Sequence, residues 1–387
     1  FGTDDQSANI YAPTIMAEQM NADTNPYGTS VYVGFHSNAT TGNPSTATAR
    51  GAIGLVHSTG PTPNQSGLAT RLARQINVDL RALNGTFAYD WSTRTTYTGS
   101  GAYGEINNSR ALGEFDATII EVAFHDNTED AALLRDPRVR DQIARSTYEG
   151  TLEHLIDFPG TTTVPVDVTT PAVPLRVQAV SGASGEVTVS WQPGASSANG
   201  VDGVYGSPAT AFRVYGSVDG RGFDGGTLVA GAASRSVTLQ GLDPTRTYFF
   251  RVVAENTGGQ SVASEVVAAT PTGGTRQVLV VDGFDRLDTS RNFKQAYPGG
   301  TTNDRAWSAF NNPRNGVVPV VAAIQAARPG VWVDAASNEA VAAGAVTLAN
   351  YQAVVWILGN ESTAGRTFDA TEQSLVEAYV AGGGDLL

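Results

Sequence analysis

The chain contains no cysteine, and this absence excludes several kinds of site at once. Without thiols there is no disulfide framework, no thiolate zinc site and no cysteine nucleophile. Basic residues are also scarce, because 24 Lys and Arg stand against 37 Asp and Glu and the net charge is -13. Since no basic cluster interrupts this acidic balance, we expect no nucleic acid partner. No apolar run approaches the roughly 20 residues that a membrane span needs, so none is expected.

The 387 residues are enough for two or three domains, each with a sizeable core. Richness in Thr, Ser, Gly and Pro favours an exported bacterial protein, either secreted into the medium or periplasm or held at the cell surface. The chain begins at Phe1 rather than at a methionine, and residues 382–387 resemble a turn that enters a strand. We therefore expect a fragment of a longer protein.

The first predicted domain, residues 1–158, alternates apolar runs with helical patterns. The expected elements are strands at 31–35, 54–56 and 118–124, and helices at 66–84 and from 137 onward. Strands that alternate with helices predict an α/β layer fold with a mostly parallel sheet.

Residues 159–173 are rich in Pro and Thr without periodicity, which predicts a semi-rigid linker. From 174 to 272, short alternating strands separated by Gly, Asp, Asn and Pro predict a β-sandwich. Three features of this segment resemble a fibronectin type III domain: Trp191, the Leu242-Asp243-Pro244 turn before Tyr248, and the strand at 251–256. The resemblance implies an all-β sandwich that serves as a spacer or binding module.

Residues 276–387 return to an α/β pattern. The expected elements are strands at 277–282 and 353–358 and helices at 318–327 and 372–380. The pattern distantly resembles the glutamine amidotransferase-like fold, an open α/β sheet, here truncated. Because those enzymes use a thiol nucleophile that this chain lacks, a structural or carbohydrate-binding role is expected.

His36 and Glu121 stand out in the first domain because each lies at or inside an apolar strand. An ionisable group buried among apolar residues is unfavourable unless it has a partner or a task. An imidazole suits a metal ligand, and a carboxylate suits a base that takes a proton from metal-bound water. The plainer alternatives are a polar strand end for His36 and a buried salt bridge for Glu121.

The residues around this pair resemble zinc-dependent N-acetylmuramoyl-L-alanine amidases of the amidase-3 type, over roughly residues 12–155. The matching segments are Val33 to Ala39, Arg50 to Ala52, Ile120 to Asn127 and Glu129 to Leu134. The resemblance implies that His36, in a His-x-Asn motif, binds zinc and that Glu121 is the catalytic carboxylate. Ala123 stands where the family has glycine, and His125 stands where it has an apolar residue.

The resemblance also implies two further zinc ligands, a histidine and a glutamate, upstream of His36. No histidine lies between Phe1 and Phe35, so this chain lacks at least one of them. A catalytic zinc usually has three protein ligands and a water. We therefore expect the remaining ligands upstream of Phe1, and we expect the fragment alone to be inactive.

Further polar residues near these motifs are expected to contact substrate or to support the ligands: Asn38, His57, His125 and Asn127. Asn38 is expected to brace the loop after His36. His57 either contacts substrate or is an exposed strand-end histidine, and His125 either faces the site or caps the next helix. His154 is expected to be structural. A metal site of His36, His57 and His125 is a third interpretation, and it requires their loops to converge.

The sequence therefore favours a peptidoglycan hydrolase that cleaves the amide between the lactyl group of N-acetylmuramic acid and L-alanine. Zinc held partly by His36 would polarise the scissile carbonyl, and Glu121 would transfer the proton. Peptidoglycan is the expected partner, and the fibronectin-like and third domains are expected to bind other cell-surface glycans or proteins. The alternative is a non-catalytic surface or cell-wall-binding protein with a degenerate amidase-like domain.

Overall fold

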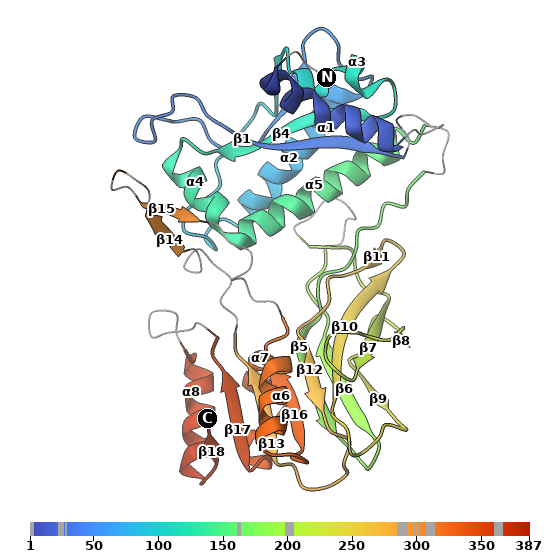
Figure 1. Cartoon of the computed structure of the whole chain (residues 1–387), viewed down its shortest axis with the longest axis vertical. Helices are drawn as coiled ribbons and strands as arrows, with labels where there is room; N and C mark the ends of the chain where they lie inside the picture. The colour runs from blue at the N-terminus through green and yellow to red at the C-terminus, as the bar shows by residue number, and fades with distance from the viewer. Residues whose placement is uncertain are drawn as a thin grey trace. The chain divides into compact units, whose positions relative to one another are not determined.

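The computed structural model describes residues 4–387 with the exception of 22–26, 28, 161–163, 198–204, 285–292, 297–298, 300–301, 306–313 and 360–366. These residues form two compact units (Figure 1). The N-terminal unit consists mainly of residues up to Thr169, and the C-terminal unit begins at Thr170. The predicted linker therefore contains the boundary between the units, although its residues 161–163 lie outside the described part. The C-terminal unit holds both the predicted sandwich and the predicted third domain.

The N-terminal unit is built on a four-stranded sheet. Its elements are α1 (Asp5–Asn21), β1 (Val31–Asn38), β2 (Ile53–His57), α2 (Gln65–Ala82), β3 (Thr98–Gly101), η1 (Gly104–Ile106), α3 (Asn108–Ala111), β4 (Asp116–Phe124), α4 (Thr128–Arg135) and α5 (Pro137–Asp157). The strand order is β1-β4-β2-β3, so β4 and β2 are the inner strands.

The expectation of a mostly parallel sheet is wrong at the centre of this sheet. β1 and β4 are parallel, and so are β2 and β3, but β2 and β4 are antiparallel. Parallel neighbours need a long crossover, usually a helix. β1 and β2 are joined by a loop without a helix, so the alternation of strands and helices on which the expectation rested is interrupted there.

The two faces of this sheet bury different layers. On one face, α2 presents Leu68, Leu72 and Ile76, four residues apart, to Ile120 of β4. On the other face, Ile119 packs with residues of η1 and α3 and with a partly buried residue of α1. Because side chains alternate along a strand, Glu121 lies on the same face as Ile119.

Local sequence explains which helices could be predicted. α5 begins at Pro137, and the carboxylate of its N-cap Asp136 accepts a hydrogen bond from the backbone N–H of Arg138. Helix α1 was not predicted, because it contains Pro13 and has almost no amphipathic pattern.

The C-terminal unit contains the predicted β-sandwich followed by an α/β region. The sandwich strands are β5 (Leu175–Ser181), β6 (Val187–Gln192), β7 (Ala211–Ser217), β8 (Thr227–Ala230), β9 (Ser236–Leu239), β10 (Tyr248–Asn256), β11 (Gly259–Gln260) and β12 (Val267–Ala269). The α/β elements are β13 (Val278–Asp282), α6 (Val317–Ala327), β16 (Val333–Ser337), α7 (Asn338–Ala342), η4 (Leu348–Asn350), β17 (Ala353–Ile357), α8 (Ala370–Ala381) and β18 (Asp385–Leu386). A hairpin of β14 (Phe293–Ala296) and β15 (Thr302–Arg305) belongs to the N-terminal unit, and among the described strands it pairs only within itself.

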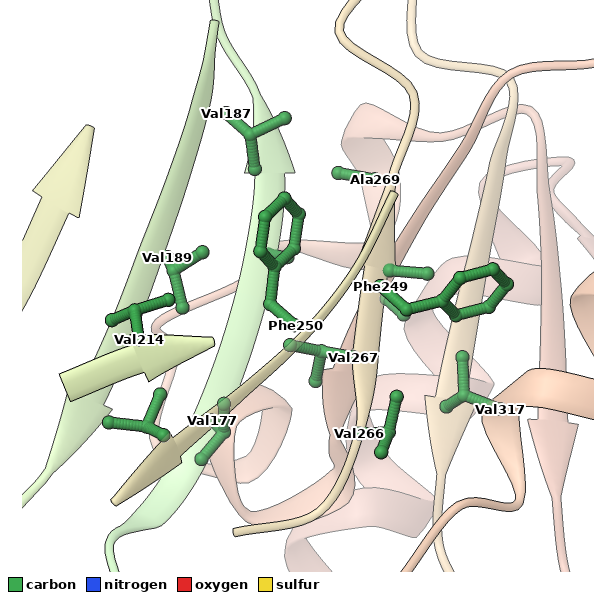
Figure 2. Close-up of a cluster of buried hydrophobic side chains, with 14 of the residues drawn as sticks. Val177, Val187, Val189, Val214, Phe249, Phe250, Val266, Val267, Ala269 and Val317 are labelled. Atoms are coloured by element: carbon green, nitrogen blue, oxygen red, sulfur yellow. The ribbon is translucent and has the colours of Figure 1, made fainter. Parts of the chain in front are cut away.

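Strand β16 joins the two parts of this unit. It pairs in parallel with β13 on one side and antiparallel with β12 and β5 of the sandwich on the other. Two consecutive phenylalanines of β10 pack on opposite sides of the strand. Phe250 points toward Val187 inside the sandwich, whereas Phe249 points toward Val317 of α6 (Figure 2). The sandwich and the α/β region therefore share one apolar core.

A buried carboxylate ends strand β13. Asp282 is 1% exposed, and its Oδ2 has no hydrogen-bond partner among the described residues. Burial raises the pKa of Asp282 to about 6. The charge of Glu339 contributes to this rise, whereas the hydrogen bond from the backbone N–H of Phe284 lowers the pKa. Ionised Asp282 is thus unfavourable in the folded state.

The Asp282→Asn variant is expected to be more stable than the wild type at pH 7, by up to about 3 kcal/mol. The folded pKa lies above the unfolded value, so the wild type loses stability as the pH rises from about 4 to about 6. Urea unfolding at pH 4 and pH 7 measures the difference. Asp167→Asn, at an exposed position, is the control, and an equal gain at both pH values would contradict the prediction.

Candidate functional site

His36 and Glu121 lie side by side on adjacent strands of the N-terminal unit. They are register partners in the parallel β1–β4 pair, so their side chains emerge on the same face. The imidazole of His36 is 43% exposed, and Glu121 is half-buried. The structure thus brings together the predicted metal ligand and the predicted catalytic carboxylate.

The sequence did not predict the residue that contacts His36 directly, Glu105 of η1. Its Oε2 lies 2.9 Å from His36 Nε2, and its Oε1 accepts a 2.7 Å hydrogen bond from the Tyr32 hydroxyl. Gly34 makes room for this carboxylate, since a Cβ on Gly34 would lie 2.4 Å from Glu105 Oε1. The alternation of Tyr32, Gly34 and His36 on one face was the available signal, but nothing in the sequence indicated which residue covers the glycine.

The carboxylate of Glu121 has an unsatisfied oxygen. Its Oε2 is buried and has no hydrogen-bond partner among the described residues. Burial raises the pKa of Glu121, the imidazoles of His36 and His125 oppose the shift, and the Glu105 charge adds to it. The site therefore groups two histidines and two carboxylates near one strand end.

The remaining predicted residues near the site hold its loops. His125 is exposed, and its Nδ1 lies 3.0 Å from both the hydroxyl and the carbonyl oxygen of Ser37. It does not cap α4, because the N-cap is Asn127, whose side chain accepts from two backbone N–H groups and donates to a carbonyl. Asn38 Oδ1 accepts from the backbone N–H of the next residue, Ala39.

His57 and His154 lie in other environments. His57 is 5% exposed, so the expectation of an exposed histidine is wrong. Its Nδ1 accepts from the backbone N–H groups of Thr59 and Gly60, and its Nε2 contacts an asparagine amide. His154 is fully buried with Nε2 3.1 Å from Asp116 Oδ2, which is a structural contact.

The described residues do not fit a complete zinc site. No group of three or more His, Asp or Glu side chains among them could hold a metal ion. The imidazole Nε2 of His36 meets the Glu105 carboxylate instead. A metal site made of His36, His57 and His125 therefore has no support among the described residues.

A buried carboxylate holds the loop that follows His36. Asp126 Oδ2 accepts hydrogen bonds from the backbone N–H groups of Thr40, Thr41 and Gly42 at 2.7 to 3.0 Å. These bonds, with that of Thr41 the strongest, lower the pKa of Asp126 to about 2. The loop is thus attached to the end of β4.

A second carboxylate joins the other segments of the predicted motif. Asp130 of α4 is fully buried, and its Oδ1 accepts from Arg50 Nε at 2.8 Å. Its Oδ2 accepts from the backbone N–H groups of Gly51 and Phe124. The segment at Arg50, the end of β4 and the start of α4 therefore meet at one side chain.

Comparison with known proteins identifies one part of the chain. Residues 172–270 match the fibronectin type III domain. Similar solved structures include the FN5 domain of Drosophila Lar (20% identity, 27% of this chain and 100% of that chain, TM-score 0.21). Others are the chicken CNTN1 FN1–FN3 domains (20% identity, 26% and 32%, TM-score 0.22) and titin domains A168–A170 (25% identity, 26% and 31%, TM-score 0.22).

These matches cover about a quarter of the chain. No curated protein matches the sequence. Two features noted in the sequence agree with the fibronectin type III match: the Tyr248 hydroxyl accepts a 3.0 Å hydrogen bond from the backbone N–H of Asp243, and Trp191 packs on Phe212. Among the described helices, none is long and apolar enough to cross a membrane.

The Asp126→Ala variant is expected to release the loop at residues 40–42, because it removes the acceptor of three backbone N–H groups. Amide hydrogen exchange of these residues, followed by NMR, should accelerate about tenfold or more. In the wild type the protection should persist until the pH falls to about 2, since the lowered pKa keeps Asp126 ionised.

Asp90→Ala is a matched control, because Asp90 accepts from the backbone N–H of Gly85 in a different loop. Unchanged exchange at residues 40–42 in Asp126→Ala would show that the loop is held by other contacts.

Proposed function

We propose that the N-terminal unit is a peptidoglycan amidase domain that hydrolyses the N-acetylmuramoyl-L-alanine bond in an exported bacterial protein. The observation that carries this proposal is the register of His36 with Glu121 on parallel strands, at the motif positions that resemble the amidases. In this proposal Glu121 transfers the proton and His36 is one ligand of a zinc ion. No further ligand for such a zinc ion is present among the described residues.

The chain's own residues suit this chemistry. Glu121 is half-buried and its Oε2 has no described partner, so in this proposal its carboxylate accepts a proton from a water bound in the site and returns it to the leaving amine. Glu105, itself oriented by the Tyr32 hydroxyl, fixes the ring of His36. The carboxylate of Asp126 anchors the loop beside it. The carboxylate of Glu121 thus lies among side chains that are held in place by hydrogen bonds, and a catalytic site needs such fixed neighbours.

One observation favours the second candidate, a non-catalytic cell-wall-binding protein. The nitrogen of His36 that points to Glu105 is already in contact with a carboxylate at 2.9 Å. A degenerate site could keep such an ion pair for stability alone. Under this alternative the unit would bind peptidoglycan without cleaving it.

The Glu121→Gln variant of the full-length protein is expected to lose about 100- to 10,000-fold in muropeptide cleavage, because the amide cannot accept the proton. Release of stem peptides from purified sacculi, measured by liquid chromatography, gives the rate. The zinc content of the protein, measured by elemental analysis, should stay unchanged, since Glu121 is not proposed as a ligand.

Glu153→Gln is the matched control, because Glu153 lies on α5 and forms long contacts with Arg71 and Arg74. Undiminished turnover in Glu121→Gln would overturn the assignment. Wild-type protein that binds sacculi but contains no zinc and releases no peptide would establish the non-catalytic alternative.

A further inference from the structure

The C-terminal unit contains a cleft that is separate from the site around His36. Its volume is about 930 Å³. Three segments form most of its lining: the turn before β10 from Asp243, the end of β12 and the segment that leads from α6 into β16. Because the sandwich and the α/β region share a core beneath it, the walls of the cleft are held in a fixed arrangement.

Hydrogen-bonded polar groups form the floor of this cleft. The side-chain amide of Gln325 donates to the Thr247 hydroxyl, which lies 2.7 Å from the hydroxyl of Thr270. Thr270 Oγ1 also accepts from the backbone N–H of Val333. Thr247 and Thr270 are almost fully buried, so their hydroxyls have fixed directions. Fixed polar groups in a cleft give a ligand its orientation.

An indole ring forms one wall. Trp332 is only partly buried, and its backbone N–H donates to Gln277 Oε1 at 2.9 Å. Its ring lies close against Gly274, because a Cβ on that glycine would be 2.2 Å from the ring. The indole is therefore a rigid apolar surface beside a polar floor.

The charged lining residues are Asp243 and Arg246, and only the Asp243 side chain forms hydrogen bonds with described residues. The carboxylate of Asp243 accepts from the backbone N–H and the hydroxyl of Thr245. Arg246 is exposed, and its side chain makes no hydrogen bond or ion pair with the described residues. Its charge helps to lower the pKa of Asp243, but its N–H groups remain available as donors to an anionic group in a chain of net charge -13.

We propose that this cleft binds a saccharide that carries a carboxylate. The ring face of a pyranose is lined by C–H groups, which suits the indole of Trp332, and its hydroxyls suit the side chains of the floor. The sugar carboxylate pairs with Arg246. This function goes beyond the hydrolytic site and does not depend on it.

The lining favours a sugar over a peptide. Hydroxyl and amide side chains are the largest group in it: Ser184, Thr245, Thr247, Thr270, Thr272 and Gln325. Peptide partners usually insert large apolar side chains into dry pockets or pair with a free strand edge. The strand that follows Trp332, β16, is already paired on both sides.

The test titrates the full chain with tetragalacturonate, cellotetraose and tetra-L-glutamate, and follows the indole N–H signal of Trp332 by NMR. Tetragalacturonate is expected to bind about tenfold more tightly than cellotetraose, the usual effect of one charged hydrogen bond. Arg246→Ala should reduce its affinity to that of cellotetraose. Arg235→Ala, at another arginine of the sandwich that lies outside the cleft, should change neither affinity.

Both Trp332 variants lose the indole signal, so their binding is measured by isothermal titration calorimetry. Trp332→Phe keeps a flat ring and should retain binding, whereas Trp332→Ala should abolish it. If Trp332→Ala does not fold, the Arg246→Ala and Trp332→Phe results still decide. The proposal is wrong if neither saccharide binds, if Arg246→Ala behaves like Arg235→Ala, or if tetraglutamate binds as tightly as tetragalacturonate. None of these outcomes bears on cleavage of sacculi, which tests the other unit.

Discussion

The double burial of strand β4 is the constraint on which the N-terminal unit depends. Its neighbours β1 and β2 satisfy the backbone on both edges, and helices or loops cover both faces. A strand in this position cannot shift its register by one residue without exchanging Ile119 and Ile120 between two different cores. The position of Glu121 beside His36 is therefore a consequence of packing, and it does not require a ligand to hold it.

The same packing explains how the site combines fixed and unsatisfied groups. Glu105, Asp126 and Asp130 each accept several donors from segments that are distant in the sequence. Their bonds fix the loops at the end of β4. Two buried oxygens at the site, Oε2 of Glu121 and Oδ1 of Asp126, nevertheless have no hydrogen-bond partner among the described residues. Buried polar groups are usually satisfied, and an exception beside other ionisable groups is typical of a functional site.

Much of this arrangement could be predicted from the sequence, and the failures have physical causes. Helix α2 and strand β4 follow from local periodicity, whereas the expectation that His36 and Glu121 share a site rests on the resemblance of their motifs. The contact of Glu105 with His36 could not be predicted, since it depends on how a short 3₁₀ turn packs against the sheet. The antiparallel β2 and the burial of His57 likewise depend on tertiary pairing that periodicity does not encode.

The pairing of β16 with both β13 and the sandwich has a consequence for modularity. Fibronectin-like domains are commonly regarded as independent, exchangeable modules. In this chain, however, strands β5 and β12 of the sandwich pair with β16 and so cover one edge of the α/β sheet. Cutting the chain after Thr272 would leave β16 with unpaired backbone groups and would expose Val317, two changes that promote aggregation. The smallest portable piece of this protein that includes the fibronectin-like sandwich is therefore the sandwich together with its α/β neighbour.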